Sequence, residues 1–215
     1  LILLDIPTRY AENPDEYFAK GLALRDETKH HPLVSHAFAP HAPYSVSDGP
    51  LKKVQMLADE LDLPVHIHLH ETASEVEESI KNTGQRPLAR LTQLGLLSPA
   101  LTAVHMTQLN DSEITQLAES GASVVHCPES NRKLASGFCP VKKLLDAGVN
   151  VALGTDSAAS NNDLDMFSEM KTAALLAKGI SGEATAVPAH QALAMATING
   201  AKALGISDKT GSLSI

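Results

Sequence analysis

A histidine and a glutamate three residues apart, His68 and Glu71, are the side chains of this sequence best suited to chemistry. Both lie in the segment PVHIHLHE at residues 64–71, in which aliphatic residues alternate with imidazoles and which Glu71 ends. Such alternation is typical of a β-strand with apolar side chains on one face and polar ones on the other. Buried imidazoles need partners, so the pattern predicts that His68 binds a divalent metal and that Glu71 moves protons beside it. A packed core histidine beside an acid that favours a helix N-terminus is the alternative.

Asp156 is the second candidate ligand. It follows an apolar strand predicted at residues 149–154, and residues 154–162 (GTDSAASNN) are rich in hydrogen-bonding side chains and poor in packing ones. As a metal ligand, Asp156 would also accept a proton from an attacking water molecule. The alternative is an acid that only caps the following helix.

Two further histidines follow predicted strands. His105 ends the apolar run at residues 101–104, where an imidazole could polarise a substrate atom or steady a metal-bound hydroxide. His41 lies between two prolines in APHAPY, and their fixed backbone suits a side chain presented to a ligand. A half-buried structural histidine and a proline-rich turn without function are the respective alternatives.

The remaining polar residues near these positions are not expected to bind the metal. His66 shares the strand face of His68, and His70 should pack beside the site; both are expected to support the structure rather than bind the metal. We also expect a structural role for His126. The residues that follow it are better suited to line a pocket with hydrogen-bonding groups: Glu129, Ser130 and Asn131.

The elements that must position these side chains form about six units of strand, loop and amphipathic helix. Strands are predicted at residues 1–6, 34–39, 64–70, 101–106, 122–127 and 149–154. Helices are predicted at residues 14–26, 48–61, 74–82, 86–94, 111–120, 141–147, 164–178, 188–196 and 199–204. Residues 128–140 are expected to form an irregular loop.

Alternating strands and helices imply a parallel sheet, either open and doubly wound or closed as a barrel. No GxGxxG or GxxxxGK motif follows a strand, so the nucleotide-binding open sheet lacks its fingerprint. The candidate residues follow the carboxyl ends of strands, where the catalytic residues of a (β/α)₈ barrel lie. We therefore predict an α/β fold of the TIM-barrel type, truncated because two strands would have to precede Leu1. An open α/β binding protein is the alternative.

Composition excludes several classes of function. A formal charge of −8 argues against nucleic-acid binding or an anionic membrane surface. No apolar run approaches the roughly 20 residues that span a bilayer. The two cysteines, Cys127 and Cys139, form no CxxC pattern and no disulfide framework, which favours a reducing, cytoplasmic compartment.

Five motifs taken in order resemble one family. They are PHAPY at 40–44, HLHET at 68–72, VH at 104–105, HCPESN at 126–131 and GTDS at 154–157. Together they resemble the amidohydrolase superfamily, in its branch of 5-methylthioadenosine/S-adenosylhomocysteine deaminases and triazine hydrolases. The resemblance extends from about Ile2 to Leu213, and NGAKALG at 199–205 also fits it.

The resemblance implies a role for each candidate residue. His68, after the fifth barrel strand, and Asp156, after the eighth, would bind one divalent metal ion, commonly Zn²⁺ and sometimes Fe²⁺ or another ion. Glu71 would shuttle protons, His105 would lie close to metal and substrate, and Asp156 would accept the proton of the water. The implied substrate contacts are His41, Glu71, His105 and Asp156.

The implied reaction is hydrolytic deamination of an adenine-type nucleoside, 5-methylthioadenosine or S-adenosylhomocysteine, in which a metal-activated water releases ammonia. The alternatives are hydrolysis of another aminated or chlorinated N-heterocycle, such as guanine, 8-oxoguanine or an s-triazine, and a non-catalytic barrel. The family's first-strand His-x-His pair and its small β-sandwich domain are absent. Residues 1–215 therefore correspond to about strands three to eight plus C-terminal helices of a longer protein. The resemblance also allows a homodimer.

Overall fold

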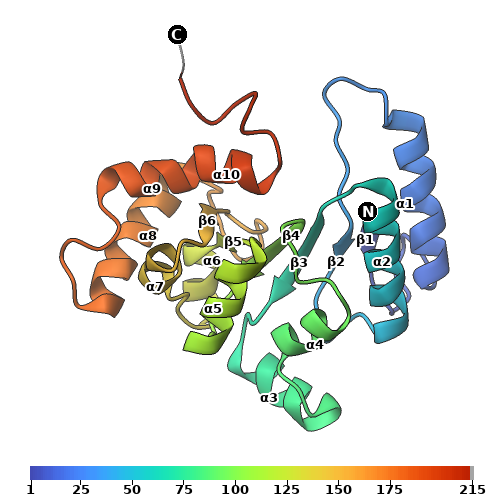
Figure 1. The fold of residues 1–215 in the computed structure, drawn as a ribbon, viewed down its shortest axis with the longest axis horizontal. Coiled ribbons are helices and arrows are strands. Elements are labelled where there is room, and N and C mark those ends of the chain that lie inside the picture. Colours follow the sequence, from blue (N-terminus) through green and yellow to red (C-terminus); the bar gives the residue numbers. More distant parts are fainter. Residues whose placement is uncertain (214–215) are drawn as a thin grey trace.

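The computed structural model describes residues 1–213, in which parallel strands alternate with helices (Figure 1). The strands are β1 (Ile2–Leu3), β2 (Ala39–Pro40), β3 (Val65–Leu69), β4 (Leu101–His105), β5 (Ser123–His126) and β6 (Asn150–Leu153). The helices between β1 and β5 are α1 (Pro14–Thr28), α2 (Asp48–Leu61), α3 (Ala73–Thr83), α4 (Pro87–Gln93) and α5 (Asp111–Ser120). Those after β5 are α6 (Pro128–Lys133), α7 (Val141–Asp146), α8 (Met166–Ser181), α9 (Ala189–Ala196) and α10 (Ile198–Ala203).

The strands lie side by side in the order in which they occur along the chain. β3, β4, β5 and β6 form one parallel sheet, and β1 pairs in parallel with β2. The two sheets are joined at Phe38, whose N–H donates to the Pro64 carbonyl (2.9 Å) and whose carbonyl accepts from the His66 N–H (2.8 Å). A doubly wound sheet reverses its strand order at a switch point. The described strands show no such reversal, which favours the predicted barrel-type arrangement over the open one.

Strand β3 shows why this sequence forms a two-faced strand. Val65, Ile67 and Leu69 are buried, whereas His66 and His68 between them are only partly buried. The aliphatic face joins the core, which also receives the apolar stripe of α2: Leu51, Val54 and Ala58. The opposite face is therefore left for imidazoles, as the alternation in the sequence predicts.

Two predicted strands are much shorter than expected. Of residues 1–6 only Ile2–Leu3 pair, and of residues 34–39 only the end does, where the N–H of Ala39 donates to the Leu1 carbonyl (2.8 Å). The N–H of Val34 instead donates to the His31 carbonyl in a turn, and Val34 is exposed. The apolar residues of this segment form a strand-like pattern, although the neighbouring chain offers backbone partners only from residue 37 onward.

The predicted irregular loop after β5 contains a helix, α6, which the sequence does not predict because PESNRK has no apolar stripe. Pro128 at its start suits the first turn of a helix, where no N–H is needed. Among the described residues, no helix combines the length and the apolar character that crossing a bilayer requires.

Candidate metal and catalytic site

Three candidate residues from distant parts of the chain meet at the carboxyl ends of the strands. His68 lies near the end of β3, His105 is the last residue of β4, and Asp156 follows β6. One potential ligand atom from each lies within 4.8 Å of the others. The predicted pair His68 and Asp156 therefore does converge, and His105 joins the same group.

Two of the candidate ligands, His105 and Asp156, have a strained backbone conformation. His105 has φ 76° and Asp156 has φ 60°, in the left-handed region that residues other than glycine avoid. Gly154 allows β6 to end close to β5, because a Cβ atom there would lie 2.9 Å from a methyl carbon of Val125. The GTD segment thus requires glycine for close packing before the chain turns at Asp156.

Asp156 is held by hydroxyl groups from helix α6 and from the loop after β6. Ser130 on α6 and Ser160 both donate to Oδ2 of Asp156, at 2.7 and 2.8 Å. Partial burial acts to raise the pKa of Asp156, but the bonds from Ser130 and Ser160 outweigh it and hold the pKa below its usual value. Asp156 is therefore an anion near neutral pH.

His68 is a neutral imidazole because burial disfavours its charged form. Burial lowers its pKa to about 4, and the neighbouring rings of His105 and His41 add to this effect. The ring centroids of His68 and His105 lie 5.1 Å apart, and those of His68 and His41 are also 5.1 Å apart with the planes at 89°. A neutral ring keeps a nitrogen lone pair free for a metal ion.

His105 is oriented by Asn131 and faces Glu71. Its Nδ1 lies 2.8 Å from Oδ1 of Asn131, and its Nε2 lies 3.8 Å from Oε2 of Glu71. If Nδ1 donates to the amide oxygen, Nε2 carries the lone pair on the side of Glu71. The backbone of Glu71 is fixed as well, since its N–H donates to Glu75 (2.6 Å) and its carbonyl accepts from Thr107 (2.7 Å).

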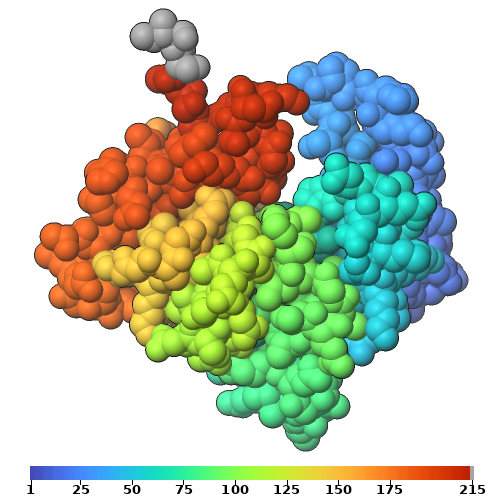
Figure 2. All heavy atoms as spheres, viewed as in Figure 1, coloured from blue at the N-terminus to red at the C-terminus, as the bar shows by residue number. Residues whose placement is uncertain are grey.

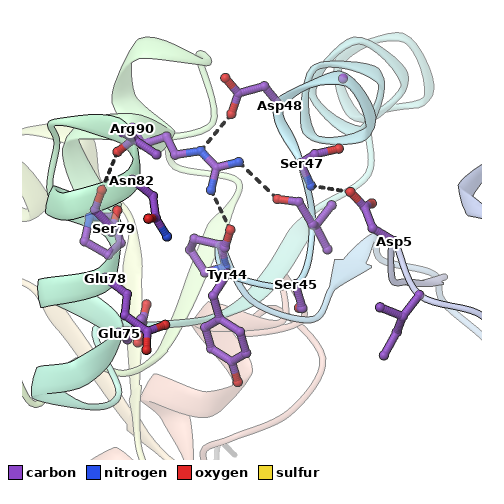
Figure 3. A pocket seen from close by; sticks show the side chains of 16 residues that line it. Asp5, Tyr44, Ser45, Ser47, Asp48, Glu75, Glu78, Ser79, Asn82 and Arg90 are labelled. Carbon is purple, nitrogen blue, oxygen red and sulfur yellow. Dashed lines mark hydrogen bonds and ion pairs between the residues drawn. The ribbon is translucent and has the colours of Figure 1, made fainter.

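His41 completes this side of the site. Its Nδ1 lies 2.8 Å from the hydroxyl of Ser45, its ring meets that of Tyr44 edge-on, and burial lowers its pKa. A cavity of about 670 Å³ adjoins this loop, and Figure 3 shows Tyr44, Glu75 and Arg90 around it. Arg90 donates to the carboxylate of Asp48 (2.7 Å) and to backbone carbonyls of the loop, which fixes the segment that carries His41.

The histidines interpreted as structural lie outside the ligand group. His66 lines a separate cavity of about 530 Å³ with Leu63 and Pro64, which precede β3, so it faces the amino-terminal side of the strands. Figure 2 shows a hollow between the C-terminal helices and the N-terminal segment. Arg25 of α1 and Leu204, which follows α10, line the same cavity as His66.

His70 and His126 are fully enclosed. His70 accepts a hydrogen bond from the N–H of Leu88 (3.0 Å) at Nε2, and its Nδ1 lies 3.1 Å from the Gln108 carbonyl oxygen. Burial lowers the pKa of His126 to about 3, and its Nδ1 has no partner within residues 1–213. Both rings are therefore neutral parts of the interior.

The hydrogen-bonding residues after β5 have different positions. Ser130 and Asn131 contact Asp156 and His105, respectively, whereas Glu129 accepts from Ser168 (2.6 Å) and Thr172 (3.0 Å) on α8. Ser160 was not singled out from the sequence. Its only signal was its place in a loop rich in serine and asparagine.

The donor set fits a divalent transition metal. Two imidazoles and one carboxylate are ligands that zinc and similar ions accept, and catalytic zinc sites often hold three protein ligands with one open position.

Comparison with known proteins now identifies the family. The model of the amidohydrolase family matches residues 6–215. The chain belongs to the amidohydrolase family. This membership confirms the predicted family and α/β fold class, and rejects the open α/β binding protein.

Individual amidohydrolase-family relatives agree with this assignment. A 5-methylthioadenosine/S-adenosylhomocysteine deaminase of Teredinibacter turnerae is 58% identical over 211 residues, which cover 98% of this chain and 48% of that protein. The crystal structure of an adenosine deaminase from Xanthomonas campestris with bound zinc has a TM-score of 0.98 and 57% identity, over 100% of this chain and 49% of that one. A triazine hydrolase from Arthrobacter aurescens has a TM-score of 0.89 and 25% identity, over 95% and 45%. The chain spans about half the length of the curated relatives it matches.

Proposed function

We propose that the whole protein is a metal-dependent hydrolytic deaminase of an adenine-type nucleoside, 5-methylthioadenosine or S-adenosylhomocysteine. The observation that carries the proposal is the convergence of His68, His105 and Asp156 beside Glu71 at the carboxyl ends of parallel strands. The names of the deaminases at 57–58% identity support the substrate class.

We propose His68 and Asp156 as ligands of one divalent ion, with His105 next to it. The zinc in the Xanthomonas campestris structure supports Zn²⁺, and Fe²⁺ is the alternative. When bound, such an ion lowers the pKa of a water molecule toward neutrality and so supplies a nucleophile. The family's first-strand His-x-His pair has no counterpart in residues 1–213, because His66 and His68 have that spacing but correspond to the fifth strand. Further ligands from elsewhere in the protein are therefore part of the proposal.

The side chains of this chain supply the proton transfers. Asp156 is ionised and accepts a proton from the attacking water as the oxygen–C6 bond of the adenine ring forms. Glu71 delivers a proton to ring nitrogen N1 of the adenine. His105, whose Nε2 lies 3.8 Å from Oε2 of Glu71, orients the reacting groups. Protonated Asp156 then donates its proton to the C6 amino group, and the C6–N bond breaks so that ammonia leaves. The C6 hydroxyl returns its proton to Glu71, and a hypoxanthine ring remains. His41 contacts the substrate from the loop after β2.

The organisation of the whole protein is also proposed. Residues 1–215 correspond to strands three to eight of the barrel plus the C-terminal helices, and a small β-sandwich domain lies elsewhere in the protein. A homodimer and a cytoplasmic location complete the proposal. Both cysteines are free and buried, which fits a reducing compartment.

Ammonia release tests the activity. Protein expressed from the whole open reading frame is incubated with 5-methylthioadenosine, S-adenosylhomocysteine, guanine, 8-oxoguanine and an s-triazine, and its metal content is measured in parallel. We expect near-stoichiometric metal and the highest kcat/KM on one of the two adenine nucleosides. Stoichiometric metal without turnover of either nucleoside contradicts the proposed substrate.

Two other functions would give different results. The similarity to the triazine hydrolase favours another N-heterocycle as the second candidate substrate, and it predicts highest turnover of the s-triazine or of guanine. A non-catalytic barrel predicts neither metal nor turnover.

A further inference from the structure

Within residues 1–213, the two side-chain hydroxyls that donate to Asp156 reach the same carboxylate oxygen. The hydroxyls of Ser130 and Ser160 come from different segments, α6 and the loop after β6, and both donate to Oδ2. Ser130 is fully buried and Ser160 is 5% exposed, so water does not compete freely for these bonds. Two strong O–H donors occupy the lone pairs of Oδ2, which leaves Oδ1 as the oxygen available to a cation.

A buried carboxylate on α8 connects the two serines. Glu169 is fully buried, and its Oε1 accepts from the side-chain amide of Asn161, the residue after Ser160. Its Oε2 accepts from the N–H of Glu129, the residue before Ser130 (3.3 Å). One side chain therefore ties together the two backbone segments that present the hydroxyls.

We propose that Ser130, Ser160 and Glu169 are positioning residues that restrict Asp156 to binding the metal through Oδ1 alone. The inference rests on the proposed metal site and adds how its carboxylate is oriented. It also accounts for the left-handed backbone of Asp156 (φ 60°), because such a conformation persists only where surrounding bonds fix it. Without the hydroxyls, Oδ2 becomes free and the carboxylate can rotate or bind the ion with both oxygens.

The test uses Ser130→Ala, Ser160→Ala and the double variant in protein expressed from the whole open reading frame. The matched control is Ser136→Ala, because Ser136 is also buried but its hydroxyl has no hydrogen-bond partner within residues 1–213. Zinc affinity is measured by competition with a chelator, and the visible absorption of the Co²⁺-loaded protein reports the coordination number. The melting temperature of the metal-free protein shows whether each variant is folded.

We expect each serine variant to bind zinc about 10- to 100-fold more weakly than the wild type. The double variant should show weaker Co²⁺ absorption, as an added oxygen ligand raises the coordination number. Glu169→Gln, which retains one acceptor oxygen, should weaken zinc binding less, and Ser136→Ala should match the wild type in both measurements.

Distinct results overturn the two proposals. Wild-type protein without metal removes the metal site itself, and this inference with it. A wild type that binds metal, beside folded serine variants with the same affinity and Co²⁺ spectrum, removes only the positioning role. Unchanged affinity in Glu169→Gln removes Glu169 from the set.

Discussion

At the scale of single residues, the chemistry depends on protonation states that the site itself creates. Burial keeps His68 uncharged, with a pKa of about 4, while hydrogen bonds keep Asp156 charged. Near neutral pH, His68 therefore offers a neutral nitrogen and Asp156 an anionic oxygen to a cation. Neither residue must lose a proton before a cation binds.

Glu71 is the residue whose replacement best separates catalysis from binding. It lies next to His105 but outside the group of three candidate ligands. We expect Glu71→Gln to lower kcat by about 10²- to 10⁴-fold, the usual contribution of a general acid or base, while metal content stays at the wild-type level. Ammonia-release assays measure kcat, and metal analysis measures the metal content. Retained turnover would exclude Glu71 as the proton shuttle.

The individual site residues could be found in the sequence because each follows an apolar run. His68, His105 and Asp156 are polar residues at predicted strand ends, and all three meet in the structure. Ser160 could not be found in this way, because its role depends on a hydrogen bond that forms only after a turn with a left-handed residue at Asp156. No local pattern encodes such a contact.

At the scale of elements, short segments between the strands fix the site. The six-residue helix α6 supplies both Ser130, which holds Asp156, and Asn131, which holds His105. The sequence predicted these residues as pocket groups but not the helix, because a helix of fewer than two turns is too short to show an apolar periodicity.

Arg86 links α4 to α5 through a bidentate salt bridge to the buried carboxylate of Glu113. Its Nε and Nη2 donate to the two oxygens of Glu113, at 2.6 and 2.8 Å. Arg86→Met leaves the carboxylate of Glu113 buried without its cation, and because Arg86 is 30% exposed we expect a loss of about 1–3 kcal/mol, below that for a fully buried pair. Thermal unfolding measures this loss.

A surface pair provides the control for that variant. Lys143 and Asp111 form an exposed ion pair (2.7 Å), so Lys143→Met should cost at most about 1 kcal/mol. Equal melting temperatures for the two variants would show that the Arg86–Glu113 pair contributes no more than a surface pair.

Glu75 makes the start of α3 sensitive to pH. It accepts from the N–H groups of His70 and Glu71, and burial raises its pKa to about 7 from an ordinary value of 4.5. The folded state thus binds a proton that the unfolded state releases, so the stabilisation is present below about pH 4.5 and is lost as the pH rises to about 7. Glu75→Gln should flatten this part of the curve.

Melting temperatures at pH 5 and pH 7.5 test the effect of Glu75. The wild type should lose more stability between these values than Glu75→Gln does, while groups common to both proteins cancel in the comparison. A parallel decline in the two proteins would contradict the raised pKa.

At the scale of the whole molecule, the order of the units was predictable and their lengths were not. Alternation in β3, short apolar runs in β4 to β6 and helical patterns located these strands and most helices within a few residues. The pairing of β1 and β2 is limited to two residues each, because strand length depends on which neighbouring backbone is within reach. An apolar run alone carries no such information.

Metal removal should affect the stability of the whole molecule. A bound ion would tie β3 and β4 to the loop after β6, and ligand binding to the folded state adds about 4 kcal/mol when the free ligand is at 1,000 times its Kd. We expect a chelator to lower the melting temperature of protein from the whole open reading frame, and zinc to restore it. An unchanged melting temperature would indicate that no ion links these segments.

The order of the strands also bears on how the protein matures during synthesis. Since neighbours in the sheet are neighbours in sequence, each unit can dock onto the previous one as it leaves the ribosome. The three converging residues, however, are numbers 68, 105 and 156, and the last of these emerges long after the first. Capture of an ion by this group would therefore be a late event, and a nascent chain that stalls before β6 would present two imidazoles without the aspartate that completes the group.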